Sequence, residues 1–357
     1  PLICFAAKAN TNLTIMRMLG KLGSGADVVS GGELLKALKA GIKPNKIVFS
    51  GVGKTEVELK LAIRKKILLI NVESESEAIL INKIGRKINK IISIGFRINP
   101  NVDAKTHKKI STGKAENKFG VSIKNFSLFY KNIKQFKHLK VDAMSVHIGS
   151  QILSDTPYKK TLGVLSKIIK DLNIRLKYVD LGGGFGIKYN KKDKQVNLNN
   201  YARLVYDFKK KIDCNIIFEP GRYLVGNTGI LVSKIQYIKK GQNKNFIIID
   251  AGMNDFMRTA LYDANHDIVP IIKTSKRGQK SIEFVGPICE TTCKFIKYKK
   301  YQKIKEGDFV AITNVGAYGT SLSSNYNTKP LIAEILTSKN SFKIIRKKQD
   351  LLKLINS

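Results

Sequence analysis

The sequence predicts a (β/α)8 barrel of the TIM type, followed by a mostly antiparallel β domain. Two observations lead to this fold class. Before residue 224, short apolar runs that favour strands alternate with amphipathic stretches, and parallel strands need such a helical crossover each time. From residue 224 onward, the apolar runs are bounded by Gly, Asn and Pro with fewer helical stretches between them, as in antiparallel sheets. We therefore expect a barrel domain at residues 1–223 and a β domain at residues 224–357.

The barrel prediction depends on eight units of strand and helix. Strands are predicted at residues 2–8, 26–30, 46–50, 68–73, 91–98, 141–147, 178–181 and 216–219. Apolar spacing predicts helices between them, including residues 12–22, 31–40, 55–65, 75–84, 123–135 and 158–172. In the second domain, the predicted strands include residues 230–238, 246–250, 282–285, 309–313 and 331–336.

The formal net charge of +37 first suggests a partner that is nucleic acid or an anionic membrane. The basic residues are mostly lysines scattered along the whole chain, and Ile and Asn are similarly abundant, which indicates a coding bias rather than a binding surface. We expect no specific nucleic acid as a partner. A basic RNA-binding barrel without enzymatic activity remains an alternative, and its affinity would fall steeply with salt.

Composition also bears on the compartment. No apolar run is long enough to span a bilayer, so we expect no membrane partner. The four cysteines form no CxxC pair and have no neighbouring histidines that would complete a zinc site. We expect a reduced, cytoplasmic protein without a metal. Since the chain begins with Pro1 directly before a predicted strand, we also expect that it lacks an N-terminal segment.

Polar side chains gather at the predicted carboxyl ends of the barrel strands, where active sites of this fold lie. A lysine at the end of an apolar strand is usually a solvated residue, but Lys8 shares its rim with other polar and glycine-rich residues. The rim residues are Lys8, Asp27, Arg97, His147, Ser150, the glycines 182–184 and the Glu-Pro-Gly-Arg turn at 219–222.

These residue types together suit one cofactor. Glycines after the seventh strand let backbone N–H groups approach a phosphate. Lys8 on an apolar rim can lose its proton and form a Schiff base. Glu219 could keep a pyridine nitrogen protonated, and His147 could lie flat against the ring. The combination predicts pyridoxal 5′-phosphate better than a phosphosugar.

The motifs FAAKANTN, GSGADVVSGGEL, FSGVGKT, FRINPNV, VHIGSQI, DLGGGFGI, FEPGR, MRTALYDA, GPICE and GAYGTSLSSNYN resemble those of the fold-type III pyridoxal-phosphate decarboxylases, and more narrowly those of the diaminopimelate decarboxylases. The resemblance runs from Phe5 to Pro330. It implies an alanine racemase-like barrel and a β domain, working as a homodimer with shared active sites. It also implies residues ahead of the strand that bears the lysine. The implied reaction converts meso-2,6-diaminopimelate to L-lysine and carbon dioxide, the last step of lysine biosynthesis.

The resemblance also implies residue roles. Lys8 would hold the cofactor covalently, Cys289 of a partner subunit would return a proton to the reacting carbon, and His147 would stack on the ring. Further cofactor contacts are implied for Asp27, Ser150, Gly183, Gly184, Glu219, Pro220, Gly221, Arg222 and Tyr318. The far end of the substrate would be bound by Arg222, Arg258, Tyr262, Glu290 and Tyr318.

Substrate choice depends on that far end. A second amino-acid group needs cations for its carboxylate, which Arg222 and Arg258 supply, and an anion for its ammonium, which Glu290 supplies. Decarboxylases of ornithine, arginine or lysine remain an alternative, but they typically have Cys-Asp at positions 289–290. A racemase of this fold generally has a tyrosine base at position 289. After GPICE, the resemblance predicts Ser-Gly-Asp, whereas this chain has Thr291, Thr292 and Cys293.

Weaker signals have structural interpretations. GVGKT at 51–55 resembles a phosphate-binding loop, but the Walker pattern needs a glycine where Val48 stands. Arg97 is either an ion-pair partner at the rim or a support for the cofactor site. The remaining histidines, His107, His138 and His266, are expected at surface or structural positions.

Overall fold

The computed structural model describes residues 1–104, 110, 112–114, 116–189, 192–273, 278 and 280–356. The chain forms two compact units, of which the first comprises Pro1–Ile187 and Lys194–Tyr223. The second comprises Lys188–Asp193 and Leu224–Ser357, so a short segment from within the barrel part of the sequence belongs to the β unit. His107 lies outside the described residues.

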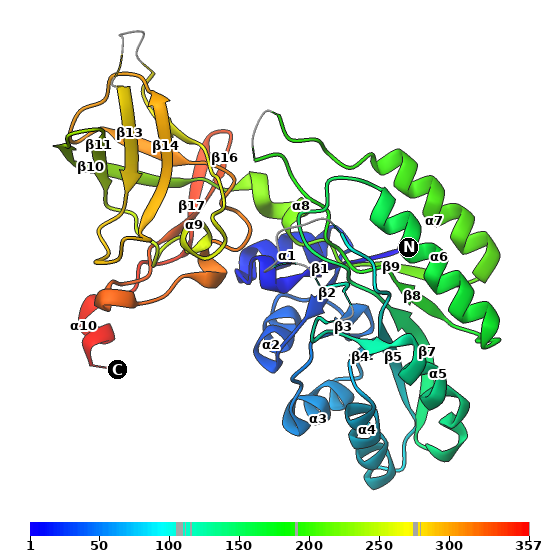
Figure 1. Ribbon diagram of the computed structural model, residues 1–357. Coiled ribbons are helices and arrows are strands. Elements are labelled where there is room, and N and C mark those ends of the chain that lie inside the picture. The colour runs from blue at the N-terminus through cyan, green and yellow to red at the C-terminus, as the bar shows by residue number, and fades with distance from the viewer. Residues whose placement is uncertain are drawn as a thin grey trace. The chain divides into compact units, whose positions relative to one another are not determined.

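The first unit is a closed barrel of eight parallel strands, as the sequence predicts (Figure 1). Neighbouring strands pair in chain order, β4 pairs with β5, and β9 pairs with β1 to close the ring. The two-residue strand β6 (Val121–Ser122) pairs with β5 outside the ring. The eight barrel strands are β1 (Leu2–Ala6), β2 (Gly25–Val28), β3 (Ile47–Phe49), β4 (Leu69–Val72), β5 (Ile92–Asn99), β7 (Leu139–Ser145), β8 (Tyr178–Asp180) and β9 (Asn215–Phe218).

Helices connect these strands, and polar side chains begin most of them. Thr55 and Glu58 form a capping box at the start of α3, and Ser30 and Ser74 accept from backbone N–H groups of α2 and α4. The predicted helix at 123–135 is shorter, because it ends at Lys131 and a separate 3-10 turn follows. The helices are α1 (Leu13–Lys21), α2 (Gly31–Lys39), α3 (Glu56–Arg64), α4 (Glu75–Lys87), α5 (Ile123–Lys131), α6 (Thr156–Asp171), α7 (Leu198–Ile212) and α8 (Arg222–Val225).

The barrel interior changes character along its axis. A cluster of Cys4, Val48, Leu69, Ala143 and Ile217 fills part of it, and each of these side chains is buried. Apolar packing of this kind holds the strands in register. Towards the carboxyl ends, the buried residues become polar, and they include Asp27, Asn71, Glu73, Arg97, Asp180 and Glu219.

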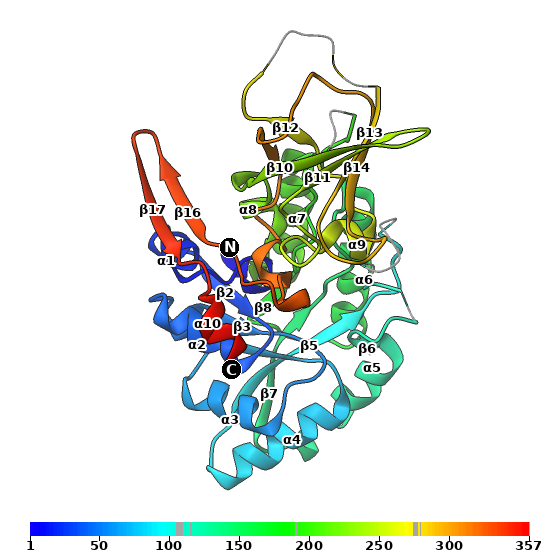
Figure 2. The ribbon, with the colours of Figure 1, turned by 90° about the vertical axis from the view of Figure 1, so that its left-hand side faces the viewer.

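The second unit is mostly antiparallel, as predicted, except that β11 and β13 run parallel. Its core contains Ile235, Ile247, Phe256, Phe284 and Val310. Figure 2 shows β16 and β17 side by side as a separate hairpin. Its elements are β10 (Leu231–Lys240), β11 (Asn245–Ile249), α9 (Arg258–Tyr262), β12 (Ile268–Pro270), β13 (Lys280–Val285), β14 (Lys294–Lys300), β15 (Phe309–Ile312), β16 (Glu334–Ser338), β17 (Ser341–Arg346) and α10 (Leu351–Ile355).

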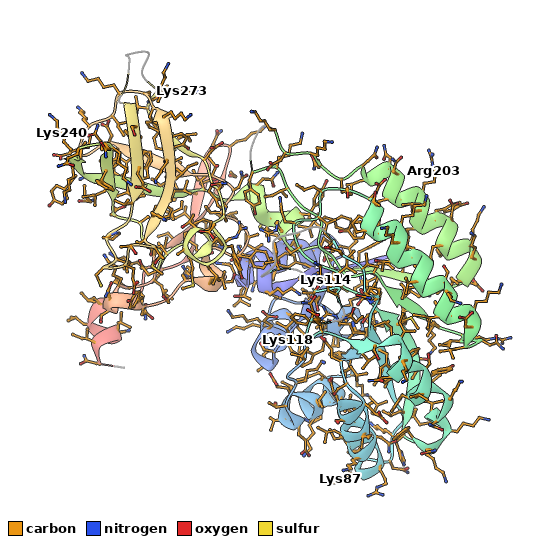
Figure 3. All side chains as sticks on the ribbon, in the orientation of Figure 1. Lys87, Lys114, Lys118, Arg203, Lys240 and Lys273 are labelled. Atoms are coloured by element: carbon orange, nitrogen blue, oxygen red, sulfur yellow. The ribbon has the colours of Figure 1, made fainter. Side chains whose placement is uncertain are left out.

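The basic residues are distributed over many elements. Figure 3 labels Lys87 on α4, Arg203 on α7 and Lys240 on β10, which lie in separate parts of the two units. Among the described residues, no helix combines the length and the hydropathy that a membrane crossing needs.

Candidate active site

Lys8 lies in a 3-10 turn, Ala7–Ala9, that directly follows β1. The predicted strand at 2–8 is therefore two residues too long, because the backbone turns at Ala7. Nζ of Lys8 lies 3.0 Å from Oδ2 of Asp27, whose side chain is fully buried on β2. The other oxygen of Asp27, Oδ1, has no hydrogen-bond partner among the described residues. The amine thus stands beside a buried carboxylate with unused acceptor capacity.

Two further carboxyl groups lie buried at the ends of β8 and β9. Glu219 accepts a hydrogen bond from Oγ of Ser50 at 3.4 Å, and Asp180 accepts one from Nδ2 of Asn71 at 2.9 Å. Burial, and then the charges of Asp180 and Asp27, raise the pKa of Glu219 well above its usual value. Burial also raises the pKa of Asp180, to about 6. Asp180 was not among the predicted site residues, although its place at a strand end before three glycines was a signal.

His147 follows β7, and its Nδ1 accepts a hydrogen bond from the N–H of Gly183 at 3.2 Å. Burial, and then the positive charges of Lys8 and Arg97, lower the pKa of His147 well below its usual value. The imidazole is therefore neutral at physiological pH. A neutral ring near Lys8 adds no positive charge to the rim.

The predicted phosphate residues come from the loops after β7, β8 and β9. Nη2 of Arg222 donates to Oγ of Ser150 at 2.9 Å. A Cβ at position 183 would lie 2.1 Å from the carbonyl oxygen of Glu219, and one at position 184 would lie 2.3 Å from that of Gly149. The backbone at position 184 also has a φ of +93°, which favours glycine. Glycine is therefore required at both positions for the loops to approach one another.

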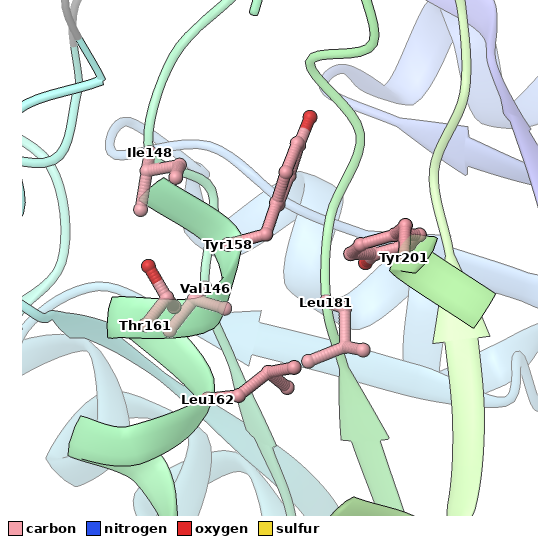
Figure 4. A pocket seen from close by; sticks show the side chains of 7 residues that line it. All are labelled: Val146, Ile148, Tyr158, Thr161, Leu162, Leu181 and Tyr201. Atoms are coloured by element: carbon pink, nitrogen blue, oxygen red, sulfur yellow. The ribbon is translucent and has the colours of Figure 1, made fainter. Parts of the chain in front are cut away.

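A small cavity lies behind the glycine loop (Figure 4). Its volume is about 10 Å³, which is no more than one water molecule occupies. Tyr158, in its wall, donates a hydrogen bond to the carbonyl oxygen of Gly183 at 3.1 Å. The cavity is thus a gap in the packing rather than a ligand site, and the hydrogen bond from Tyr158 supports the glycine loop beside it. Its lining residues are Val146, Ile148, Tyr158, Thr161, Leu162, Leu181 and Tyr201.

Arg97 forms a buried ion pair with Glu73, at 2.9 Å between Nη1 and Oε1. Its Nη2 also reaches the carbonyl oxygen of His147 at 3.3 Å. The ion-pair interpretation of Arg97 is therefore confirmed, and the same side chain contacts the backbone of a predicted cofactor residue. Glu73 was not predicted, because its partners come from distant parts of the chain.

Lys54 of the GVGKT segment is also buried, with 1% of its side chain exposed. Its Nζ donates to the carbonyl oxygens of Gly51 and Asn71 and to Oε1 of Glu77, each at 2.7 Å. An ammonium group has three donors, and all three are engaged. The segment therefore ties a loop to β4 and α4, which is a structural role, as the sequence favours.

The remaining predicted residues lie in the second unit, which is described by itself. Arg258 is 5% exposed on α9, and its Nη1 lies 2.8 Å from the hydroxyl of Tyr189 and 2.8 Å from Nε2 of His266. Nδ1 of His266 lies 2.8 Å from the carbonyl oxygen of Thr313, which can only accept. Hence Nδ1 carries the hydrogen and Nε2 accepts from Arg258. His266 is fully buried, so its predicted structural position is confirmed.

Cys289 and Glu290 lie on the exposed loop between β13 and β14. Sγ of Cys289 lies 3.5 Å from Nδ2 of Asn327, and the hydroxyl of Tyr326 donates to Oε1 of Glu290 at 2.6 Å. The unusual Cys293 is buried, and its sulfur accepts from the N–H of Met253 at 3.3 Å. Of the three residues that depart from the expected sequence, Cys293 thus packs at the base of this loop, whereas Thr291 and Thr292 are exposed.

Tyr262 and Tyr318 are half-buried in the same unit. Tyr318 has a φ of +57°, which is uncommon for a residue with a side chain. Among the described residues, no group of three or more His, Cys, Asp or Glu is placed to hold a metal ion.

The barrel residues fit the predicted cofactor. Neighbouring strand ends carry the groups that it needs. These are an amine for its aldehyde, an acid for its ring nitrogen, a neutral imidazole, and a glycine loop with an arginine for its phosphate. The unsatisfied Oδ1 of Asp27 is a buried acceptor that a polar ligand group could use. Nothing in this donor set requires a metal.

Comparisons with known proteins agree with this chemistry. Residues 1–226 match the model of the pyridoxal-dependent decarboxylase, pyridoxal binding domain. Diaminopimelate decarboxylase of Aquifex aeolicus is 43% identical over 352 residues, which are 98% of this chain and 84% of that protein. The enzyme of Helicobacter pylori strain J99 is 44% identical over 353 residues, or 98% of this chain and 87% of that protein.

Solved structures show the same likeness. The crystal structure of diaminopimelate decarboxylase from Helicobacter pylori complexed with L-lysine has a TM-score of 0.94 and 42% identity, and covers 99% of this chain and 89% of that chain. An arginine decarboxylase from Paramecium bursaria Chlorella virus has a TM-score of 0.79 and 17% identity over 91% of this chain and 86% of that chain. At this identity, the second likeness shows the fold alone.

Proposed function

This chain belongs to the diaminopimelate decarboxylase family of pyridoxal-dependent decarboxylases, and on that basis we propose that it converts meso-2,6-diaminopimelate to L-lysine and carbon dioxide. The single observation that carries the proposal is the half-buried Lys8 with the buried Asp27 and Glu219 beside a glycine loop. The reaction would be the last step of lysine biosynthesis.

The barrel, residues 1–223, would hold pyridoxal 5′-phosphate. When bound, this cofactor supplies an electron-poor ring that accepts the electron pair left by the departing carboxylate. Lys8 would hold its aldehyde carbon, Glu219 its ring nitrogen and His147 the face of its ring. The phosphate would be bound by Ser150, Gly183, Gly184, Gly221, Arg222 and Tyr318, and Pro220 would be a further cofactor contact.

Asp27 and His147 set the charge around Lys8. A lysine must lose a proton before its nitrogen can attack a carbonyl carbon. Asp27 accepts a hydrogen bond from Nζ and fixes its direction, while the neutral His147 adds no further positive charge beside it. The amine is thereby held in place at the rim of the barrel.

The β domain, residues 224–357, would bind the far end of the substrate. The Arg258 guanidinium is buried and held by Tyr189 and His266, so it offers a fixed fork for a carboxylate. Glu290 would bind the distal ammonium, and Tyr262 and Tyr318 would also contact the substrate. Cys289 would return a proton to the carbon that loses the carboxylate.

We also propose a cytoplasmic homodimer with shared active sites. Cys289 and Glu290 lie on an exposed loop, where a thiol and a carboxylate can serve a neighbouring subunit. In that arrangement, each site combines the lysine of one subunit with the thiol of the other.

The full chain, loaded with pyridoxal 5′-phosphate, tests the function directly. Carbon dioxide and L-lysine should form from meso-diaminopimelate, and kcat/KM for ornithine, arginine and lysine should be far lower. Preference for one of these three amino acids would favour the runner-up function. Bound RNA that dissociates with added salt, together with an absence of bound cofactor, would favour the non-enzymatic alternative.

A further inference from the structure

The carboxyl groups of Asp180 and Glu219 are linked inside the barrel through Asn71 and Ser50. Nδ2 of Asn71 lies 2.9 Å from Oδ2 of Asp180 and 3.3 Å from Oγ of Ser50, and that hydroxyl donates to Oε1 of Glu219 at 3.4 Å. Asp180 is fully buried and Glu219 is 6% exposed, so water does not screen their charges, and two such neighbouring carboxyl groups cannot both ionise without a large cost. The two residues come from the ends of β8 and β9, which are adjacent parallel strands. The fold therefore builds a carboxyl pair that shares one proton.

The remaining contacts place that proton on Glu219. Asp180 accepts from the N–H of Gly182 and from Nδ2 of Asn71, each at 2.9 Å. Glu219 accepts one longer hydrogen bond, at 3.4 Å from Ser50. Donors stabilise the charged form of a carboxyl group, so Asp180 is the anion and Glu219 is the acid.

The surroundings favour retention of the proton. The titratable groups that act on the pair are Cys4 and Lys8 from β1 and its turn, Asp27 from β2 and Tyr201 from α7. Lys8 is the cation that acts on Glu219, and it already lies 3.0 Å from Asp27. The carboxylates of Asp27 and Asp180 both oppose a third negative charge on Glu219.

We propose that Asp180 is a positioning residue that holds Glu219 in its protonated form until the ring nitrogen of a pyridine cofactor takes over that proton. This inference rests on the proposed function, which supplies the pyridine ring. In this step the O–H bond of Glu219 breaks and an N–H bond forms with the lone pair of the ring nitrogen. The Glu219 carboxylate then accepts a hydrogen bond from that N–H. No proton has to enter the buried barrel from water.

The ligand-free full chain gives the first test. A carboxyl group whose pKa is raised in the folded state binds a proton there that the unfolded state lacks, so stability falls as pH rises between the two pKa values. We expect Tm to fall between about pH 5 and about pH 9, and Asp180→Asn to remove about half of that fall or more. A merely structural role for Asp180 would lower Tm equally at both pH values. If Tm falls with rising pH as much in Asp180→Asn as in wild type, the proposal is overturned.

Two further variants support this test. Asp142→Asn is the matched control, because Asp142 is a buried aspartate on β7 with lysine and serine partners, and its fall in Tm should equal that of wild type. Asn71→Ala removes a donor from the Asp180 anion, so the pair binds its proton more tightly and the fall should increase. If Asp180→Asn does not fold, Asn71→Ala tests the proposal instead. A fall of Tm with pH in Asn71→Ala that is equal to or smaller than that of wild type would then reject the proposal.

The loaded protein gives an independent measurement. With pyridoxal 5′-phosphate labelled with ¹⁵N in the ring, NMR reports the pH at which the ring nitrogen loses its proton. Removal of the Asp180 charge should lower that pH by about one unit or more. An equal value in wild type and Asp180→Asn would contradict the inference while the proposed function stands. Absence of bound cofactor in both proteins would instead refute the proposed function, and the ligand-free result would still decide on the carboxyl pair.

Discussion

Oε1 of Glu73 lies 2.9 Å from Nη1 of Arg97, in an ion pair whose side chains are 1% and 10% exposed. Glu73 also accepts from the N–H groups of Gly51 and Gly120, and Arg97 reaches the carbonyl oxygen of His147. One pair thus connects the loops that follow β3, β5 and β7.

Glu73→Gln should therefore destabilise the protein. The variant leaves the Arg97 charge buried without its anionic partner, and such a change costs about 3 kcal/mol in the free energy of unfolding. Urea denaturation measures this. Glu56→Gln is the control, because Glu56 pairs with Lys60 on an exposed face of α3 and should matter little. Equal stability of the two variants would contradict the network.

Lys8→Ala should abolish covalent attachment of the cofactor. Borohydride reduction of the loaded wild type should add the mass of the reduced cofactor to the peptide that contains Lys8. The variant should lose decarboxylation by a factor on the order of 10³ or more. Lys36→Ala, which replaces an exposed lysine bonded to Thr11, is the control and should retain both properties. A fully active Lys8→Ala protein would refute the assignment.

Mixing two inactive variants tests the shared site. In a dimer with sites built from both chains, Lys8→Ala mixed with Cys289→Ala yields hybrid dimers that have one intact site each. Unfolded together and refolded, an equal mixture should regain about a quarter of the wild-type activity. Cys214→Ala replaces a buried cysteine and should be active alone. No regain, in a mixture that sizing shows to be dimeric, would mean that each site uses one chain.

Arg258→Lys should raise KM for meso-diaminopimelate by about 30-fold, because lysine lacks the planar fork that binds a carboxylate through two bonds. Steady-state kinetics measures this. Arg203→Lys, on the exposed face of α7 (Figure 3), should leave KM unchanged. If Arg258→Lys lowers Tm without any change in KM, Arg258 supports the domain and does not bind substrate.

Asp142 predicts a sensitivity to acid. Burial alone would raise the pKa of Asp142, but the hydrogen bond from Ser93 and the charges of Lys140 and Lys177 outweigh it and lower that pKa. A lowered pKa adds stability above the unfolded value, and this stability is lost as pH falls through the folded value. Asp142→Asn should therefore lower Tm near neutral pH, and the difference from wild type should shrink below about pH 3. A difference that stays constant would exclude this role.

Much of the barrel could be predicted because its strands are buried on both faces and appear as continuous apolar runs. The Lys8 turn was missed, since Ala6 and Ala7 are as apolar as a strand. β6 was missed as well, because a two-residue pairing has no period to detect.

The site was predictable where a residue ends a strand, as with Asp27 and Glu219. It was not predictable where contacts join distant segments. Tyr189 follows β8 in the chain yet belongs to the second unit and binds Arg258, which no local pattern indicates. Asp180 precedes glycines and has the residue type of a turn former, and its place beside Glu219 depends on the pairing of β8 with β9.

The burial of Lys54 has a practical consequence for a chain so rich in exposed amines. An acylating reagent modifies the surface lysines readily, but it reaches Nζ of Lys54 only when the loop from Gly51 moves away from β4 and α4. The rate at which Lys54 becomes labelled therefore measures how often this loop opens at the mouth of the barrel. The labelling rates of exposed lysines, by contrast, depend only on their chemical reactivity.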